Sequence, residues 1–426
     1  MRLKNLSGPV RHGAFRRLVC AHALSRFGTE LALVSVAFAV LRTAHSASAL
    51  GLVLAARTLP NVVFLVLGGV WADRLPRARV MISSDLICAV VQTALAAAVL
   101  LSASPLWLMM LLQATLGTAG AFFAPAATGL TPATVPDAEL QRANALLGLV
   151  GNGAGMLGPA LAGVLVALAG PGWSLLIDAV TFLGSALLLV PQAVAARRAS
   201  EPSGPSHRPR AMVAELAEGW QEVRTRPWLL AGIGLGLIFQ ACFAIFFTLG
   251  PVTARLYLGG AGAWGAMVTA FGAGSLLGGL LSLRVSPRRP LLAMLAALLV
   301  TTPVMVTLSL TGRLPVLLVA TGLAGLGFAA ADAFWETALQ RAVPAERLGR
   351  VAAFDRIGSS CLRPFGYLLA GSAAAVLGLP ATLRAASAVL AVSVLAVALL
   401  VPSMRRLAQR PPGGSGATEP VLAAAG

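Results

Sequence analysis

The chain has 426 residues, of which 58% are hydrophobic and 11% are charged, and its formal net charge is +17. Its mean hydropathy is +0.84. One soluble core cannot hide this much apolar surface, so the composition excludes a soluble globular protein and indicates a chain solvated by lipid. The four cysteines are far apart and lack metal-ligand spacing, which argues against a disulfide framework and against a metal site.

About twelve apolar stretches are long enough to cross a bilayer, which takes roughly 20 residues. In chain order the predicted membrane helices are 20–41, 49–71, 80–101, 106–128, 143–169, 173–194, 228–249, 262–283, 291–310, 314–338, 351–377 and 381–401. The first stretch is full length and continues into this pattern, so we expect no cleavable signal peptide. The sequence therefore predicts an all-α, polytopic membrane protein.

The first predicted helix carries a carboxylate near mid-membrane. Glu30 has Arg26 one turn before it, and Arg57 is expected at comparable depth in the second helix. A charge in lipid is costly unless it is paired or hydrated. The three residues are therefore candidates for proton and substrate coupling, and a structural salt bridge is the equal alternative.

The connection between the second and third helices is short and doubly charged. It reads Gly69-x-x-x-Asp73-Arg74, followed by an arginine-rich turn that includes Arg77. This resembles the signature loop of the major facilitator superfamily, with Pro76 in place of its second glycine. Because Pro76 fixes its own φ, the turn must be made differently here. The resemblance implies a cytoplasmic gating loop formed by Gly69, Asp73, Arg74 and Arg77.

The fifth predicted helix is rich in small residues and reads Gly155-x-x-Gly158-Pro159-x-x-Ala162-Gly163. Small residues at spacings of four let helices approach closely, and Pro159 removes a backbone hydrogen bond and bends the helix. The pattern resembles the antiporter motif of drug/proton exporters in the same superfamily, with Ala162 in place of its penultimate glycine. Gly155, Gly158, Pro159 and Gly163 are the candidate residues of this bent helix, and ordinary small-residue packing is the alternative.

Other charged residues in the predicted helices are further candidates. Asp178 lies near the outer end of the sixth helix and could couple protons. Asp85 is expected near the cytoplasmic start of the third helix, where it would neutralise arginines of the signature loop. The candidates for inner-gate ion pairs, which either break and reform during transport or are static packing, are Asp85, Asp332, Glu336, Asp355 and Arg363.

The chain is internally duplicated. The pattern VPxxxLxR at 135–142 recurs at 343–350, and GxxxAG at 158–163 recurs at 366–371, both at an offset of 208 residues. We therefore expect two six-helix halves related as parallel repeats, an arrangement of transporters that rock about a central site. The predicted domains are an N-terminal half over 1–195, a linker over 196–226, a C-terminal half over 227–403 and a disordered tail over 404–426.

The predicted linker has two parts. Its start is rich in proline, serine and arginine and should be flexible. Its end places Val213, Leu216, Trp220 and Val223 on one helical stripe and Glu215, Glu218 and Glu222 elsewhere on the wheel. This pattern predicts an amphipathic helix at the cytoplasmic membrane surface.

The arginines are distributed unevenly between the two sides of the predicted bundle. Most lie on the side of the termini and linker, so the positive-inside rule places both termini in the cytoplasm and the chain in the inner or plasma membrane. The basic residues form no continuous helix face or aromatic-interleaved patch, so no nucleic-acid partner is expected. The expected partners are the lipid bilayer, protons and a small substrate, and the expected state is a monomer.

Across most of the chain the resemblance is closest to the branch of the superfamily with macrolide efflux proteins and the enterobactin exporter. It is carried by the stretches GLVLAARTLPNVVFLVLGGVWADRL, GPALAGVLVALAG and RVAAFDRIGSS. The resemblance implies outward transport powered by a proton gradient and no cofactor. The third helix in that branch often carries an arginine where Cys88 stands, so a charge pair built on that arginine is not implied here.

Apolar helices favour an amphiphilic substrate, such as a drug, an antibiotic or a natural product of the siderophore kind. Proton-coupled uptake of a small polar nutrient is the alternative within transport. A polytopic membrane enzyme is a remote alternative, because the predicted loops lack any Asp-x-x-x-Asp run or histidine cluster.

Overall fold

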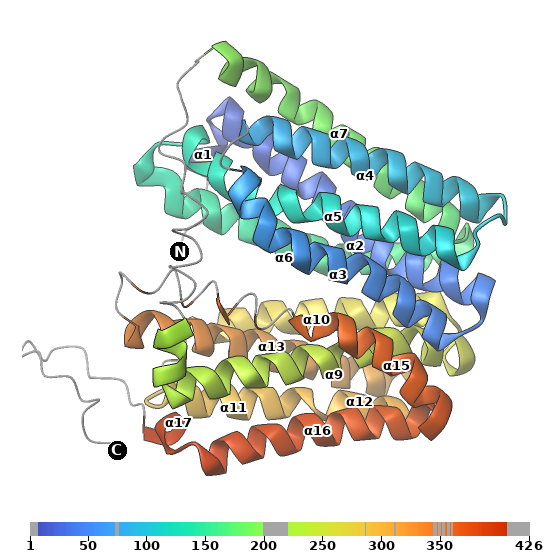
Figure 1. Cartoon of the computed structure of the whole chain (residues 1–426), viewed down its shortest axis with the longest axis vertical. Coiled ribbons are helices and arrows are strands. Elements are labelled where there is room, and N and C mark those ends of the chain that lie inside the picture. The colour runs from blue at the N-terminus through green and yellow to red at the C-terminus, as the bar shows by residue number, and fades with distance from the viewer. Residues whose placement is uncertain are drawn as a thin grey trace, which may run out of the picture.

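A computed structural model shows the arrangement of the helices (Figure 1). It describes residues 7–72, 76–198, 220–285, 287–310, 312–343, 347, 351, 354–355, 358 and 361–406. The predicted flexible part of the linker and most of the predicted tail lie outside these residues, as do Asp73 and Arg74 of the signature loop.

The N-terminal half contains one short and six long helices. They are α1 (Ser7–Val10), α2 (Gly13–Ala44), α3 (Ala47–Ala72), α4 (Arg77–Leu100), α5 (Leu106–Leu130), α6 (Leu140–Leu168) and α7 (Pro171–Arg198). Two 3-10 turns, η2 (Thr131–Thr134) and η3 (Asp137–Glu139), connect α5 to α6.

The C-terminal half begins with a helical turn over 220–225. Its further helices are α9 (Pro227–Tyr257), α10 (Ala261–Ser282), α11 (Pro290–Thr301), α12 (Pro303–Leu310), α13 (Leu314–Ala342), α15 (Arg363–Leu377), α16 (Leu379–Leu400) and α17 (Pro402–Arg406). The break between α11 and α12 falls at Pro303, which has no backbone N–H to continue the helical ladder.

Within the described residues, eleven segments are long and apolar enough to cross a membrane, with α11 and α12 together forming one. The predicted span 351–377 is described only in part, and α15 covers its second portion. The prediction of an all-α, multi-pass membrane fold is confirmed.

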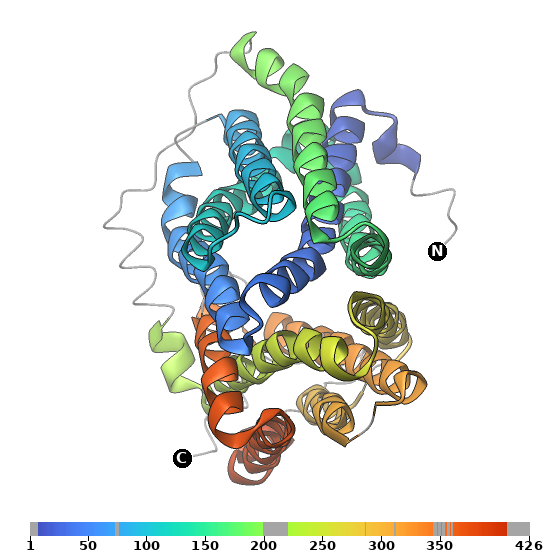
Figure 2. The ribbon, with the colours of Figure 1, turned by 90° about the vertical axis from the view of Figure 1, so that its right-hand side faces the viewer.

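The two halves lie side by side, with α2 to α7 in one group and α9 to α17 in the other (Figure 1). Figure 2, turned by 90°, shows the same separation into two bundles. The helices α1 and α17 lie at one end of the molecule, which we call the termini end.

The core of the C-terminal half contains a group of packed rings that we call the aromatic cluster. Its members are Phe239, Phe243 and Phe246 of α9, Phe271 of α10 and Phe328 of α13. Phe243 contacts all four others, and its ring centroid is 4.6 Å from that of Phe239. The helix α9 also contacts α2 and α3, so this cluster is carried by a helix that borders the other half.

Candidate functional site

The glycines of the antiporter-like pattern bring α6 close to the first helix of its own half. A Cβ added to Gly158 would lie 2.7 Å from the Cβ of Glu30 and 3.2 Å from the backbone nitrogen of Leu31. Only glycine leaves enough room at this distance. The structure therefore packs two predicted sites, the small-residue helix and the Glu30 turn, directly against each other.

The same helix contacts the other half through its next glycine. A Cβ on Gly163 would lie 2.9 Å from the carbonyl oxygen of Ala261, and one on Gly265 would lie 2.6 Å from the carbonyl oxygen of Pro159. Gly155 contributes its carbonyl oxygen, which faces α10. Backbone thus meets backbone where α6 crosses α10, and we call this contact the first seam.

The repeated pattern in α15 makes the equivalent pair of contacts. Gly366 packs against Ala241 and Ala244 of α9, the first helix of its own half, and Gly371 packs against Ser48 of α3 in the other half. Gly51 of α3 in turn packs against the backbone one residue after Gly366. We call this contact between α3 and α15 the second seam. The repeated pattern therefore makes equivalent helix contacts in both halves, in addition to repeating the same residues.

Both seams lie away from the termini end. Ser48 follows the connection between α2 and α3, and Ala261 follows that between α9 and α10, and both connections lie at the opposite end of the molecule. Figure 1 shows α3 and α15 meeting at this opposite end. Within the described residues, the close glycine contacts between the halves run from the middle of the helices to this end.

The predicted coupling residues separate into two groups. Arg26 and Glu30 form an i,i+4 ion pair on α2, with Nη2 and Oε1 3.7 Å apart. Arg57 instead interacts electrostatically with Asp178 and with Cys88. The structure thus pairs Glu30 locally and places Arg57 with the sixth-helix carboxylate.

Asp85 and Asp178 are each only 1% exposed. The carboxylate of Asp85 accepts hydrogen bonds from Ser185 Oγ at 2.5 Å and from Ser25 Oγ at 3.4 Å. Asp85 therefore joins α2, α4 and α7 through hydroxyl groups. Arg74 of the signature loop lies outside the described residues, so the roles of Asp85 in neutralising that loop and as a gate residue stay predictions.

Asp178 lies where α7 touches α2. Thr181 Oγ1 donates to its carbonyl oxygen at 2.7 Å and lies 3.4 Å from its Oδ1. A Cβ on Gly28 would collide with both Asp178 Oδ1 and Thr181 Oγ1, so α2 passes directly over the carboxylate. The two aspartates, Asp85 and Asp178, also interact electrostatically with each other.

The other predicted gate residues occupy the C-terminal half. Asp332 and Glu336 lie one turn apart on α13 and interact electrostatically, and Asp332 is exposed. Arg363 Nε donates to Tyr367 Oη at 3.1 Å, and its guanidinium carbon lies 5.8 Å from that ring. Asp355 is half-buried. The role of these residues as inner-gate ion pairs stays a prediction.

Two residues of the signature loop pattern are described. Gly69 falls within α3, and Arg77 begins α4, where its Nη1 donates to the carbonyl oxygen of Gly129 near the end of α5. The loop arginine thus ties α4 to α5 at the termini end. The gating role of Gly69, Asp73, Arg74 and Arg77 stays a prediction.

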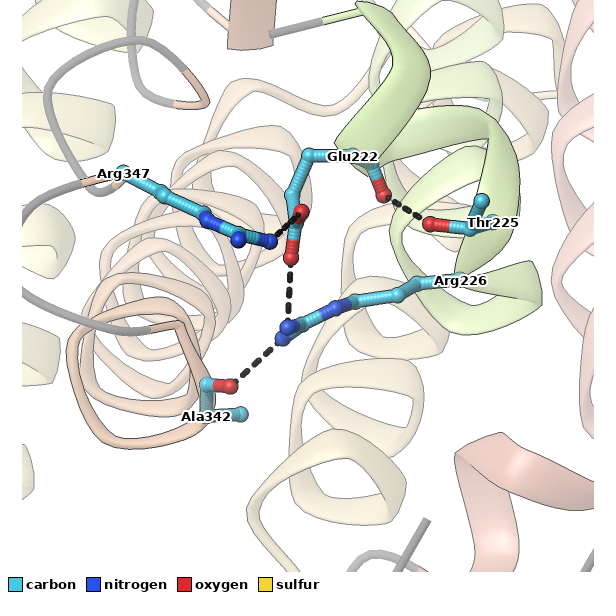
Figure 3. A network of polar contacts seen from close by, with 5 residues as sticks. All are labelled: Glu222, Thr225, Arg226, Ala342 and Arg347. Carbon is cyan, nitrogen blue, oxygen red and sulfur yellow. Dashed lines mark hydrogen bonds and ion pairs between the residues drawn. The ribbon is translucent and has the colours of Figure 1, made fainter. Parts of the chain in front are cut away.

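An ionic network around the buried carboxylate of Glu222 is the site that sequence reasoning missed (Figure 3). Glu222 Oε1 lies 2.5 Å from Arg226 Nη2, and Glu222 Oε2 accepts from Arg347 Nη1 at 2.6 Å. Arg226 Nη1 also donates to the carbonyl oxygen of Ala342 at the end of α13, at 2.7 Å. We call Glu222, Arg226 and Arg347 the inner clamp. The spacing of Glu222 and Arg226 by four residues was the signal available in the sequence.

The part of the predicted amphipathic helix that is described packs on the protein. Val223 is buried, and the Trp220 ring lies 6.0 Å from that of Phe354. Glu222, which the helical wheel placed away from the apolar stripe, is buried too. Val213 and Leu216 lie outside the described residues.

Comparison with known protein families shows to which family the chain belongs. The family model described as Major Facilitator Superfamily matches residues 18–354. The chain belongs to the major facilitator superfamily. It is therefore a transporter with multiple membrane-spanning helices, as its sequence predicted.

Two similar proteins are efflux proteins by name. Macrolide efflux protein A of Streptococcus pyogenes is 24% identical over 363 residues, which cover 83% of this chain and 88% of the relative. Multidrug efflux pump Tap of Mycolicibacterium fortuitum is 28% identical over 418 residues, which cover 93% of this chain and 98% of the relative.

Solved structures confirm the fold. A mutant form of the nucleoside transporter NupG superposes with a TM-score of 0.72 at 13% identity, covering 91% of this chain and 100% of that one. An inward-facing, occupied bacterial homologue of the lysosomal transporter Spinster gives a TM-score of 0.71 at 14% identity, covering 95% of this chain and 99% of that one.

Proposed function

We propose that this transporter exports a small amphiphilic compound, such as a drug, an antibiotic or a siderophore-like natural product, in exchange for protons. The observation that carries the proposal is the pair of seams, which join the two halves at the end opposite the termini. Two bodies joined in this way can rock about their contact and expose a central site to each side in turn.

The seams suit such a movement because they contain few interlocking side chains. Gly163 meets Gly265 in one seam, and Gly51 meets the Tyr367 backbone in the other. Small residues give close contact without hydrogen bonds that would have to be broken. The halves can therefore part at the seams and close at the termini end.

The efflux direction is supported by the two similar proteins, both of which are named as efflux proteins. An amphiphilic substrate is supported by the two partly exposed rings of the aromatic cluster, Phe271 of α10 and Phe328 of α13, since rings offer large apolar contact area. Energy would come from the proton gradient alone, without a cofactor. The chain would lie in the inner or plasma membrane with both termini in the cytoplasm. Asp73 and the loop arginines would hold the inner gate.

The test is accumulation of ethidium, an amphiphilic cation, in cells that express the chain. We expect lower accumulation than in control cells, and a protonophore should abolish the difference. A variant blocked at the second seam, Gly371→Leu, should accumulate as much as the control cells. Higher ethidium accumulation in expressing cells would instead support uptake.

The proposed topology has its own test. Reporter fusions at Ala199 and Gly260 should report opposite compartments.

A further inference from the structure

The charges around the two buried carboxylates of the N-terminal half, Asp85 and Asp178, do not balance. Arg26 and Glu30 pair with each other on α2. Arg57 interacts with the buried carboxylate of Asp178, which interacts in turn with the equally buried carboxylate of Asp85. If both carboxylates were ionised beside this one cation, one negative charge would be left over in a low-dielectric interior, which is strongly unfavourable.

A buried amide next to the carboxylates also lacks a partner. Gln92 is 0% exposed, and neither its Nε2 nor its Oε1 has a hydrogen-bond partner in the described part of the chain. Unpaired buried amides are rare in folded proteins and mark places where a ligand or water belongs.

The register of the helices aims Gln92 at this site. Gln92 follows Asp85 by two turns on α4, so both lie on one face of the helix. Two contacts fix the antiparallel register of α4 and α7: the hydrogen bond from Ser185 to Asp85 and the close approach of Gly172 to Leu100. Between these contacts, the level of Gln92 on α4 corresponds to that of α7 around residue 178.

We propose that Asp85 and Asp178 form a proton-binding site between α2, α4 and α7, with Arg57 as its fixed counter-charge. One proton bound by either carboxylate makes the group neutral, and its loss leaves a net charge of minus one. Gln92 can accept a hydrogen bond from a protonated carboxyl or donate one to a carboxylate. No covalent bond other than that to the proton changes in this exchange.

The neighbouring helices add few other titratable groups to the site. Arg57 comes from α3 and interacts with Asp178, and Cys88 of α4 interacts with both carboxylates. On α2, His22 lies one turn before Ser25, with its ring 6.4 Å from that of Phe123 of α5.

The remaining contacts of the two carboxylates are with small polar groups and backbone. They are Ser25 and Gly28 of α2 and the hydroxyls of Thr181 and Ser185 on α7. A hydroxyl can donate to a carboxylate or accept from a protonated carboxyl, so it stabilises either protonation state. The site can therefore take up and release a proton without moving a partner ion.

The inference deepens the proposed function and rests on it, because a proton site of this kind would couple export to the gradient. Its first test does not depend on transport. Infrared difference spectra of the purified chain in lipid nanodiscs, recorded between acid and alkaline pH, report protonation of buried carboxyls. We expect the signal in the wild type and its loss in Asp85→Asn or Asp178→Asn, and its retention in the surface control Asp137→Asn.

The second test uses vesicles that contain the purified chain and ethidium. Transport driven by a pH gradient is compared with exchange at equal pH on both sides. We expect the ratio of driven transport to exchange to fall about tenfold or more in Asp85→Asn and Asp178→Asn. A merely structural role would lower both rates together and leave the ratio unchanged.

The outcomes separate the two claims. A persistent carboxyl signal in both variants, a loss confined to Glu30→Gln, or a signal that responds to sodium at fixed pH would each overturn the proton site. A wild type that moves no ethidium in either mode would count against the proposed function, while the infrared result would still decide the site.

Discussion

Each half has a contact between an acidic and a basic side chain at the termini end, and the acidic and basic positions are exchanged between the halves. In the N-terminal half, Glu139 between α5 and α6 contacts His12 ahead of α2, at 3.3 Å. At an offset of 208 residues stands Arg347, which contacts Glu222 ahead of α9. The side chain of His12 is 41% exposed, whereas that of Glu222 is 10% exposed and has a second partner, Arg226. The duplication therefore preserves the contact, but of the two described carboxylates only Glu222 is buried and doubly paired.

The interiors of the two halves also differ in the kind of side chain that they bury. The N-terminal half buries Asp85 and Asp178 among hydroxyl groups and also buries Gln92, whereas the C-terminal half packs the aromatic cluster. Buried polar groups are thus central in one half, while the inner clamp of the other lies at the termini end. Substitutions of one kind should therefore have different consequences in the two halves.

The largest effect is expected in the aromatic cluster. Phe243→Ala removes a ring that is 5% exposed and contacts four others, so it should lower the free energy of unfolding by about 3–5 kcal/mol. Denaturant unfolding of the purified protein in detergent would measure it. Phe365→Ala is the matched control, because Phe365 is 53% exposed on α15. Equal losses in the two variants would show that the cluster does not stabilise the half.

The inner clamp should give the next largest effect. Glu222→Gln leaves two arginines without their carboxylate and should cost about 2–3 kcal/mol of unfolding free energy, since hydrogen bonds to charged groups are strong. Arg347→Gln should cost less than Arg226→Gln, because the Arg347 side chain is 57% exposed and that of Arg226 is 15% exposed. The same unfolding experiment checks the order, and a reversed order would refute the clamp as described.

Substitutions in the seams should change which conformation of the transporter is populated. Gly163→Ala and Gly371→Ala each add a methyl group against the backbone of the other half, and overpacking of this kind costs about 1–3 kcal/mol. The cost falls on the conformation with closed seams, so spin labels at Ser102 and Gly312 should show a longer distance distribution. Gly262→Ala is the control, because its added Cβ would meet nothing within 4 Å. An identical distribution in the seam variants and the control would contradict the rocking mechanism.

Hydropathy was enough to predict the all-α membrane fold, and small-residue spacing was enough to predict the close packing of α6. The partners of the charged residues could not be predicted in the same way. Depth along the chain groups Arg57 with Glu30, yet Arg57 interacts with Asp178, because tertiary packing decides which helices surround it. Local pairs such as Arg26 and Glu30 are readable because helix geometry alone brings them together.

The inner clamp shows a second limit of the sequence. Glu222 was treated as the polar side of a surface helix, because a helical wheel records one helix and no neighbours. Burial of that side depends on Arg347, which is 125 residues away in the chain. The repeat contained a usable signal, because the 208-residue offset aligns Glu139 with Arg347 and so marks both as contact positions.

The smallest effect is expected at the N-terminal counterpart of the clamp. His12→Gln removes one partly exposed contact, which is an ion pair when the imidazole is protonated. Exposed ion pairs contribute about 0.2–1 kcal/mol, which salt screens. Glu139→Gln should cost the same, and the double variant should cost no more than either alone. The double exchange His12→Glu with Glu139→Arg installs the charge order of the C-terminal half. The free energy of unfolding of this double variant should match that of the wild type within about 1 kcal/mol, because reversing the charges does not bury them. A loss in His12→Gln as large as that in Glu222→Gln would mean that exposure does not distinguish the two contacts, and the comparison between the halves would have to rest on their interiors alone.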